Sequence, residues 1–282
     1  MSFDELISVL KRPIFPKEHG VWVTLIVPLV TGTFAVPPDD GLKLVSAVVF
    51  GLGLIAGVMA IEPLKLIIKP TASTNKIRTY TWAVVYSFVA SACILPVIAI
   101  NGRWGLVWFL MLSAGLSALK MWAGLARFLR TIGMELVGIV GLCLTAPAAS
   151  YLQTGRVTPE SLIMYPLLIV WFVDRLFTVR RLLGILRGGV IFGSDKERYD
   201  WSKGELFIHM GALSVVALIV VFSGGVAPWT AFFPFLLLTF KFRRDISRPL
   251  LTGAMQVGFS EMRWSSAFAI LFSAAFWFKS LV

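Results

Sequence analysis

The residues best suited to chemistry in this sequence are charged side chains that stand inside or beside long apolar stretches. Glu62 is followed by Lys65 and Lys69, and this spacing of three and seven residues places all three on one face of a helix. Pro63 lies next to Glu62, where it would remove a backbone donor and leave carbonyl groups in need of partners. A carboxylate among lysines suits the binding of an anion such as phosphate, because lysine neutralises such a group as a point charge.

A second cluster of this kind lies further along the chain. Asp174, Thr178 and Arg181 share one helical face by the same spacing argument. Two interpretations of Asp174 remain open, since it is either a member of a binding site or one half of a structural ion pair, for example with Arg175. The same two interpretations apply to Glu62. We take Glu62 and Asp174 as candidates for chemistry.

Further candidates stand where other apolar stretches begin or end. His19, in the segment KEHGVW, is either a candidate base or a group that caps the start of a helix. Arginine adds a planar, bidentate fork for phosphate or carboxylate groups. The cations that we expect to bind an anionic head group are Lys65, Lys69, Arg78, Arg127, Arg130, Arg180 and Arg181.

Sequence signatures of a metal cage or a nucleotide loop are absent. The chain has no CxxC or HExxH motif and no Walker-type loop, and its histidines are His19 and His209. No cofactor is therefore expected from the residues. The run Lys241, Arg243 and Arg244 is expected to face solvent and lipid head groups.

The elements that position these residues must lie in a membrane. Of the 282 residues, 57% are apolar and 15% are charged, and the mean hydropathy is +0.84. Soluble domains have about 45–50% apolar and about 25% charged residues. The formal net charge of +11 would suggest nucleic acid in a soluble protein, but basic cytoplasmic loops explain it here, so no nucleic-acid partner is expected.

The apolar stretches predict an all-α membrane protein with about nine transmembrane helices. Each stretch approaches the roughly 20 residues that a spanning helix needs. An eight-span alternative would merge the seventh and eighth through the sequence SGGVAP, and we reject it because it demands one helix of nearly forty residues. The predicted spans are 20–36, 42–68, 78–100, 104–123, 132–153, 159–184, 205–225, 227–241 and 264–281.

Basic residues fix the orientation of these spans. In the nine-span arrangement, four of the 26 Lys and Arg residues fall on one side, and the rich side is cytoplasmic by the positive-inside rule. We therefore expect a multi-pass protein of the cell (inner) membrane, with its N-terminus in and its C-terminus out. Residues 1–12 have one apolar helical face and predict a cytoplasmic interfacial amphipathic helix, while 13–282 form a single transmembrane domain.

Three stretches carry a resemblance to a known family. The opening PKEHGVWVTLIVPLVTG resembles YwiC-like membrane proteins, which begin with a K-[EQ]-H-G-x-W segment that enters the first span. ELVGIVGLCLTAPAASYLQTG and the later FTVRRLL are similar to that family as well. The resemblance covers most of the chain and is greatest at 16–32, 135–155 and 171–183.

The resemblance implies a bundle similar to the UbiA superfamily of intramembrane prenyltransferases, which have nine spans and a cavity that faces the cytoplasm. Those enzymes hold a prenyl diphosphate through Mg²⁺ with two Asp-rich motifs, of which the first reads N-D-x-x-D-x-x-x-D. If Glu62 takes the first Asp position, Lys65 and Lys69 take the next two. Asp174 is kept in span six, but Thr178 and Arg181 follow it, so cations replace the carboxylates that a metal mechanism needs. The metal option that the resemblance leaves is one Mg²⁺ ion held by Glu62 and Asp174.

The expected function is therefore that of a prenyltransferase-like membrane protein. It would bind an anionic isoprenoid or lipid head group, such as a prenyl diphosphate, in a pocket that faces the cytoplasm. The alternative is a lipid or small-molecule transporter, or a non-catalytic integral membrane protein that binds lipid. The bilayer, a membrane lipid and an isoprenoid diphosphate are the expected partners.

Overall fold

Every regular element in the described part of the chain is a helix. The computed structural model describes residues 13–16, 20–35, 41–69, 75–125, 132–188, 194–247 and 253–281. The predicted interfacial helix at 1–12 lies outside these residues. The elements are α2 (Gly20–Phe34), α3 (Gly41–Ile68), α4 (Lys76–Asn101), α5 (Leu106–Leu125), α6 (Ile132–Cys143), α7 (Thr145–Thr154), α8 (Pro159–Gly188), α9 (Asp195–Phe222), the 3₁₀ helix η1 (Trp229–Phe232), α10 (Phe233–Ser247) and α11 (Ala254–Leu281).

Each predicted apolar stretch is a helix, once α6 and α7 are taken together. Among the described residues, six helical segments are long and apolar enough to cross a membrane, and α2 contains a shorter apolar helix. Large apolar side chains cover the outside of the bundle; Phe88 is 71% exposed and Phe222 is 81% exposed. Apolar surface on this scale needs a nonaqueous surrounding. The chain is therefore a multi-pass helical protein of membrane character.

The prediction that two helices replace one long span after residue 205 is confirmed. The seventh stretch ends with α9 at Phe222, and α10 begins at Phe233 after a turn and η1. Gly224 and Gly225 in this turn have φ angles of +61° and +85°, a region that favours glycine. The side-chain hydroxyl of Ser223 accepts from the backbone N–H of Ala227 at 3.0 Å and closes the turn.

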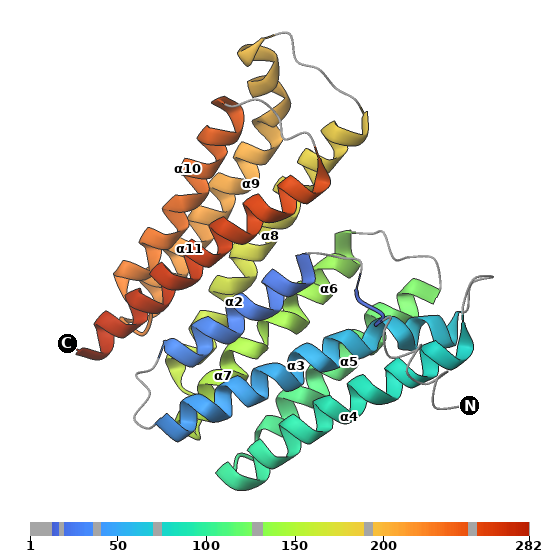
Figure 1. Ribbon diagram of the computed structural model, residues 1–282. Coiled ribbons are helices and arrows are strands. Elements are labelled where there is room, and N and C mark those ends of the chain that lie inside the picture. The colour runs from blue at the N-terminus through green and yellow to red at the C-terminus, as the bar shows by residue number, and fades with distance from the viewer. Residues whose placement is uncertain are drawn as a thin grey trace.

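The fifth stretch is broken where the sequence did not lead us to expect it. Proline 147 has no N–H to donate to the carbonyl of Cys143, one helical turn earlier, and α6 ends at that residue. After Leu144 the chain continues as α7 in the same general direction (Figure 1). The hydroxyl of Thr145 donates to the carbonyl of Leu142 at 2.8 Å and satisfies an acceptor at the break.

Successive helices run in alternating directions, with α6 and α7 acting as one (Figure 1). In that view α9, α10 and α11 lie beside α8 on one side, α3, α4 and α5 lie on the other, and α2, α6 and α7 lie between them. The helix ends that carry the predicted basic clusters therefore meet at one end of the bundle. Lys43, Arg103, Arg156 and Lys279 belong to the opposite helix ends.

Two apolar cores hold the bundle. Aromatic side chains dominate the first, where Trp171 of α8 stacks on Phe268 of α11 with ring centroids 3.8 Å apart. The second core joins α3, α4, α5 and α7 around the fully buried Phe50. Between them, α2 approaches α7 so closely that a Cβ at Gly32 would overlap the backbone of Ala146. This contact holds α2 against α7.

Candidate functional site

A group of charged side chains is buried among α8, α9, α10 and α11. In a bundle surrounded by lipid, ionisable groups of this kind usually mark a functional site. Three carboxylates and three cations are present, so the formal charges balance with a neutral histidine. The members of this buried network are Asp174, Arg175, Arg181, Glu205, His209, Lys241 and Glu261.

Asp174 and its neighbours on α8 form the first part of the network. Asp174 is 1% exposed, and its Oδ2 accepts from Nη2 of Arg175 at 2.7 Å. The same nitrogen donates to the hydroxyl of Thr178 at 2.7 Å, and that hydroxyl donates to the backbone carbonyl of Asp174 at 3.2 Å. The spacing of Asp174 and Thr178 on one face was predicted, and the structure confirms that they interact.

His209 of α9 connects α8 to α10. Its Nδ1 lies 3.2 Å from Oδ1 of Asp174, and its Nε2 lies 3.2 Å from Oγ1 of Thr239. A hydroxyl can donate or accept a hydrogen bond, whereas an ionised carboxylate only accepts. The imidazole can therefore be satisfied on both sides when it is neutral with a proton on Nδ1, and also when it is doubly protonated.

Lys241 and Glu261 extend the network to α11. Nζ of Lys241 lies 2.7 Å from Oε1 of Glu261, and Nη1 of Arg175 lies 3.6 Å from Oε2 of the same carboxylate. The expectation that Lys241 faces solvent is wrong, because its side chain is turned inward toward α11 and is 1% exposed. Arg243 and Arg244 are exposed, as expected for the rest of that run.

A further ion pair of the network lies toward the end of α8. Arg181 pairs with Glu205 of α9, and both side chains are largely buried. The guanidinium carbon of Arg175 also lies over the ring of Trp171, 5.9 Å from its centroid, in a cation–π arrangement. Buried charges need close partners of opposite sign, because removing an ion from water costs several kcal/mol when nothing compensates it. The network can thus fix the positions of the four helices relative to one another. Each of its cations is already paired with a carboxylate, so its charges are compensated within the protein.

The structure does not bring the two candidate carboxylates together. Glu62 accepts from Nζ of Lys65 at 3.3 Å on its own helix α3, whereas Asp174 faces Arg175 and His209. Within the residues that the structure describes, no group of three or more His, Cys, Asp or Glu side chains could hold a metal ion. Glu62 and Asp174 therefore do not fit a shared Mg²⁺ site, and no step through a metal is derived.

The predicted head-group cations have different surroundings. Arg180 donates from Nε to Oε2 of Glu135 at 2.6 Å, and Arg181 pairs with Glu205, so both charges are compensated. Nη2 of Arg78 donates to the backbone carbonyl of Pro13 at 3.2 Å. Lys65 and Lys69 stand at the end of α3, and Lys69 is exposed. The remaining candidates, His19, Arg127 and Arg130, lie outside the described residues.

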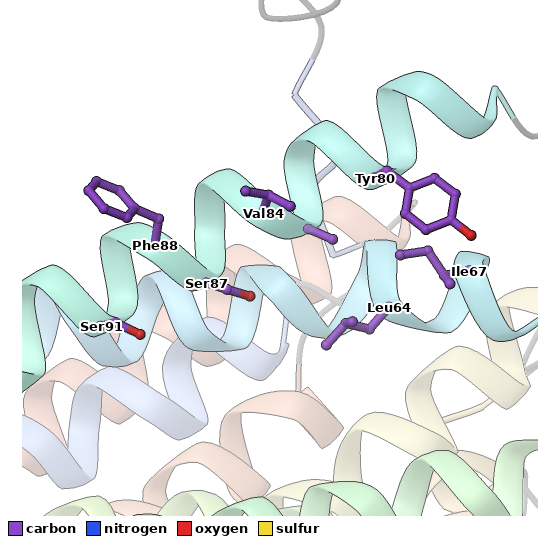
Figure 2. Close-up of a pocket in the computed structure, with 8 residues that line it drawn as sticks. Leu64, Ile67, Tyr80, Val84, Ser87, Phe88 and Ser91 are labelled. Atoms are coloured by element: carbon purple, nitrogen blue, oxygen red, sulfur yellow. The ribbon is translucent and has the colours of Figure 1, made fainter.

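An apolar groove runs between α3 and α4 and reaches the end of α3 at which these lysines stand. It has a volume of about 490 Å³, and Figure 2 shows Leu64 and Ile67 of α3 facing Tyr80 and Val84 of α4. Further along α4 it is lined by Ser87, Phe88 and Ser91. Because α3 ends and α4 begins at the same end of the bundle, Ile67 and Tyr80 lie at the basic end of the groove.

Sequence reasoning missed most of the buried network. Glu205 and His209 are one turn apart on α9, and with Ser202 they form a buried polar stripe at helical spacing. That stripe in an otherwise apolar helix was a usable signal. Lys241 and Glu261 carry no such local signal. Each is buried by its pairing with the other across α10 and α11, and the sequence of one helix alone does not show that pairing.

Part of the chain matches a known family. Residues 15–150 match the family described as YwiC-like protein. The matched range holds α2 to α6 and the first turns of α7, and so includes the groove between α3 and α4. The buried network lies beyond it. No curated protein and no solved structure matches the chain.

Proposed function

We propose that this protein binds an amphiphile with an anionic head and a long apolar tail in the groove between α3 and α4. The observation that carries the proposal is the position of that groove, which has apolar walls and reaches the same end of α3 that carries Lys65 and Lys69. An isoprenoid diphosphate is the substrate class that we favour. The prenyltransferase-like fold implied by the sequence resemblance belongs to this proposal.

The tail would lie along the walls of the groove. Leu64, Ile67, Val84 and Phe88 offer apolar contact, and Phe88 projects outward beside the groove in Figure 2. Burial of apolar surface contributes roughly 25 cal/mol per Å². In a bilayer this term largely cancels, because lipid tails compete for the same surface. Selectivity must therefore come from the head group.

The head group would lie against the lysines at the end of α3. Lys69 forms no ion pair with a described residue, and Lys65 is held by Glu62 at 3.3 Å, a partly exposed pair that an anion could replace. The hydroxyl of Tyr80 adds a donor at this end of the groove (Figure 2). Two ammonium groups near a diphosphate would stabilise it as a leaving group, which prenyl transfer requires. Glu62, Asp174 and His19 remain the candidates for chemistry.

Binding can be measured with farnesyl diphosphate as the probe. The full-length protein in nanodiscs should bind it more tightly than farnesol, which lacks the head, or diphosphate, which lacks the tail. Exchange of both Lys65 and Lys69 for Glu should abolish binding, while Lys43→Glu at the opposite helix ends should change it less than twofold. Unchanged affinity in the double Glu variant would remove the proposal.

Transport is the second candidate function, and the buried network favours it. Charged groups shared by four helices inside a bundle are typical of ion or proton pathways. Sealed proteoliposomes separate the two functions. Accumulation of unmodified substrate inside the vesicles indicates transport, and a new prenylated product indicates transfer.

The orientation completes the proposal. Basic residues gather at one end of the bundle, and by the positive-inside rule that end, with the N-terminus, would face the cytoplasm of the cell (inner) membrane. Cysteine accessibility tests this directly. A cysteine at Lys69 should react with an impermeant maleimide only after the cells are opened, and one at Arg156 should react in intact spheroplasts.

A further inference from the structure

A second hollow lies between α10 and α11, and its lining combines basic and polar side chains with two aromatic rings. Its volume of about 510 Å³ is within the usual range of small-molecule sites. Gln256, Ser260 and Arg263 occupy one face of α11 at spacings of four and three residues. The lining residues are Arg244, Gln256, Phe259, Ser260, Arg263 and Trp264.

The two guanidinium groups of this hollow differ from the other arginines at the same end of the bundle. Arg175, Arg180 and Arg181 each face a carboxylate. Arg244 and Arg263 are exposed, and within the described segments neither forms an ion pair. The carboxylate of Glu261 faces Lys241 and Arg175 instead. The linker 248–252 between the helices, RPLLT, contains no acidic residue.

Trp264 restricts one of these arginines. The guanidinium carbon of Arg244 lies 5.8 Å from the centre of the indole ring, a cation–π arrangement that limits the freedom of the side chain. Ordering in advance lowers the entropy cost of binding. Arg263 lines the same hollow from the other helix, so two positive forks border a shared space whose lining residues include no carboxylate.

We propose that this hollow binds a phosphate-bearing group between Arg244 and Arg263. Arginine matches phosphate through two parallel N–H···O bonds, and the hydroxyl of Ser260 can add a neutral hydrogen bond. The group is carried either by an anionic lipid head or by a soluble phosphate ester. The site is independent of the proposed function, because it lies on α10 and α11 and shares no lining residue with the groove between α3 and α4.

The test uses the full-length protein and two probes. Native mass spectrometry measures the affinity for dioleoyl phosphatidic acid, with dioleoyl phosphatidylcholine as the reference lipid, and calorimetry in detergent measures glycerol 3-phosphate. Loss of one charge-assisted fork should weaken binding about tenfold, and R244Q/R263Q about a hundredfold. R244K/R263K keeps the charge and loses the fork, so it should weaken binding less. The matched control is R243Q, which removes the same charge from the neighbouring exposed position of α10.

The outcomes are distinct. Binding of phosphatidic acid alone assigns the site to a lipid head, and binding of both probes assigns it to phosphate esters in general; both support the proposal when R244Q/R263Q removes them. Equal affinities of R244Q/R263Q and R243Q in both assays would overturn it, as would absence of binding to either probe. Because Arg244 and Arg263 are exposed, the thermal midpoint should be unchanged, and K65E/K69E should leave this binding intact even if the proposed function fails.

Discussion

Replacement of Lys241 by methionine should destabilise the protein far more than its place in a basic run suggests. The ammonium group is buried and lies 2.7 Å from Oε1 of Glu261, whose Oε2 lies 3.6 Å from Arg175. Removal of one partner from a buried pair costs about 3–5 kcal/mol, because the other charge is left in a medium of low dielectric constant. Since Arg175 still faces the carboxylate, we expect about 3 kcal/mol.

The double variant separates the pair from its surroundings. Lys241→Met with Glu261→Gln removes both charges, and Arg175 retains Asp174 at 2.7 Å. The double variant should therefore be more stable than the sum of the single changes by about 2 kcal/mol. Reversible unfolding in mixed micelles with increasing dodecyl sulfate, followed by circular dichroism, gives the free energies. Arg187→Met, at an exposed position of α8, is the control and should stay within about 0.5 kcal/mol. Additive single effects, or a Lys241 effect equal to the control, would refute the buried pair.

Three other changes test the packing and the surface pairs by the same unfolding assay. Gly32→Val should prevent stable folding or cost at least about 3 kcal/mol, because its side chain would overlap the backbone of Ala146; normal yield and stability would contradict the close approach of α2 and α7. Arg180→Gln should cost less than about 1 kcal/mol, since its pair with Glu135 is about one-third exposed, and a loss above 2 kcal/mol would show that this pair is buried in the membrane form. Asn75→Ala should cost about 1 kcal/mol, because the side chain of Asn75 caps α4 by accepting from the backbone N–H of Arg78, while Asn75→Asp should be nearly neutral.

The helices could be predicted because membrane spans are long and apolar. Each predicted stretch contains a helix, and the separation of α9 from α10 followed from the glycines and proline between them. The break between α6 and α7 was missed, although Pro147 carried the signal. A proline inside a spanning helix is often tolerated, as Pro63 within α3 and Pro166 within α8 show here, so its effect depends on the neighbouring helices.

The candidate site was predicted only in part. Asp174 and Thr178 were placed on one face by their spacing, and the proposed pairing of Asp174 with Arg175 is confirmed. Glu261 was missed because its partners come from other helices, whereas the polar stripe that contains His209 and Glu205 was overlooked. A helix that is apolar on all sides has no periodicity that distinguishes its inner face from its lipid face. Lys241 was predicted to be exposed because it belongs to a charged run with Arg243 and Arg244. Those two arginines are exposed, but Lys241 faces α11 and is buried.

Photochemical labelling tests the central claim of a tail-binding groove most directly. A farnesyl diphosphate analogue with a diazirine in its tail is bound to the protein in nanodiscs and activated by light, and the labelled peptides are sequenced by mass spectrometry. The account predicts labels on Val84, Ser87 and Phe88 of α4 and on Leu64 of α3, all lost in excess farnesyl diphosphate. Labels confined to α8–α11, or labels on α4 that excess farnesyl diphosphate does not remove, would contradict it.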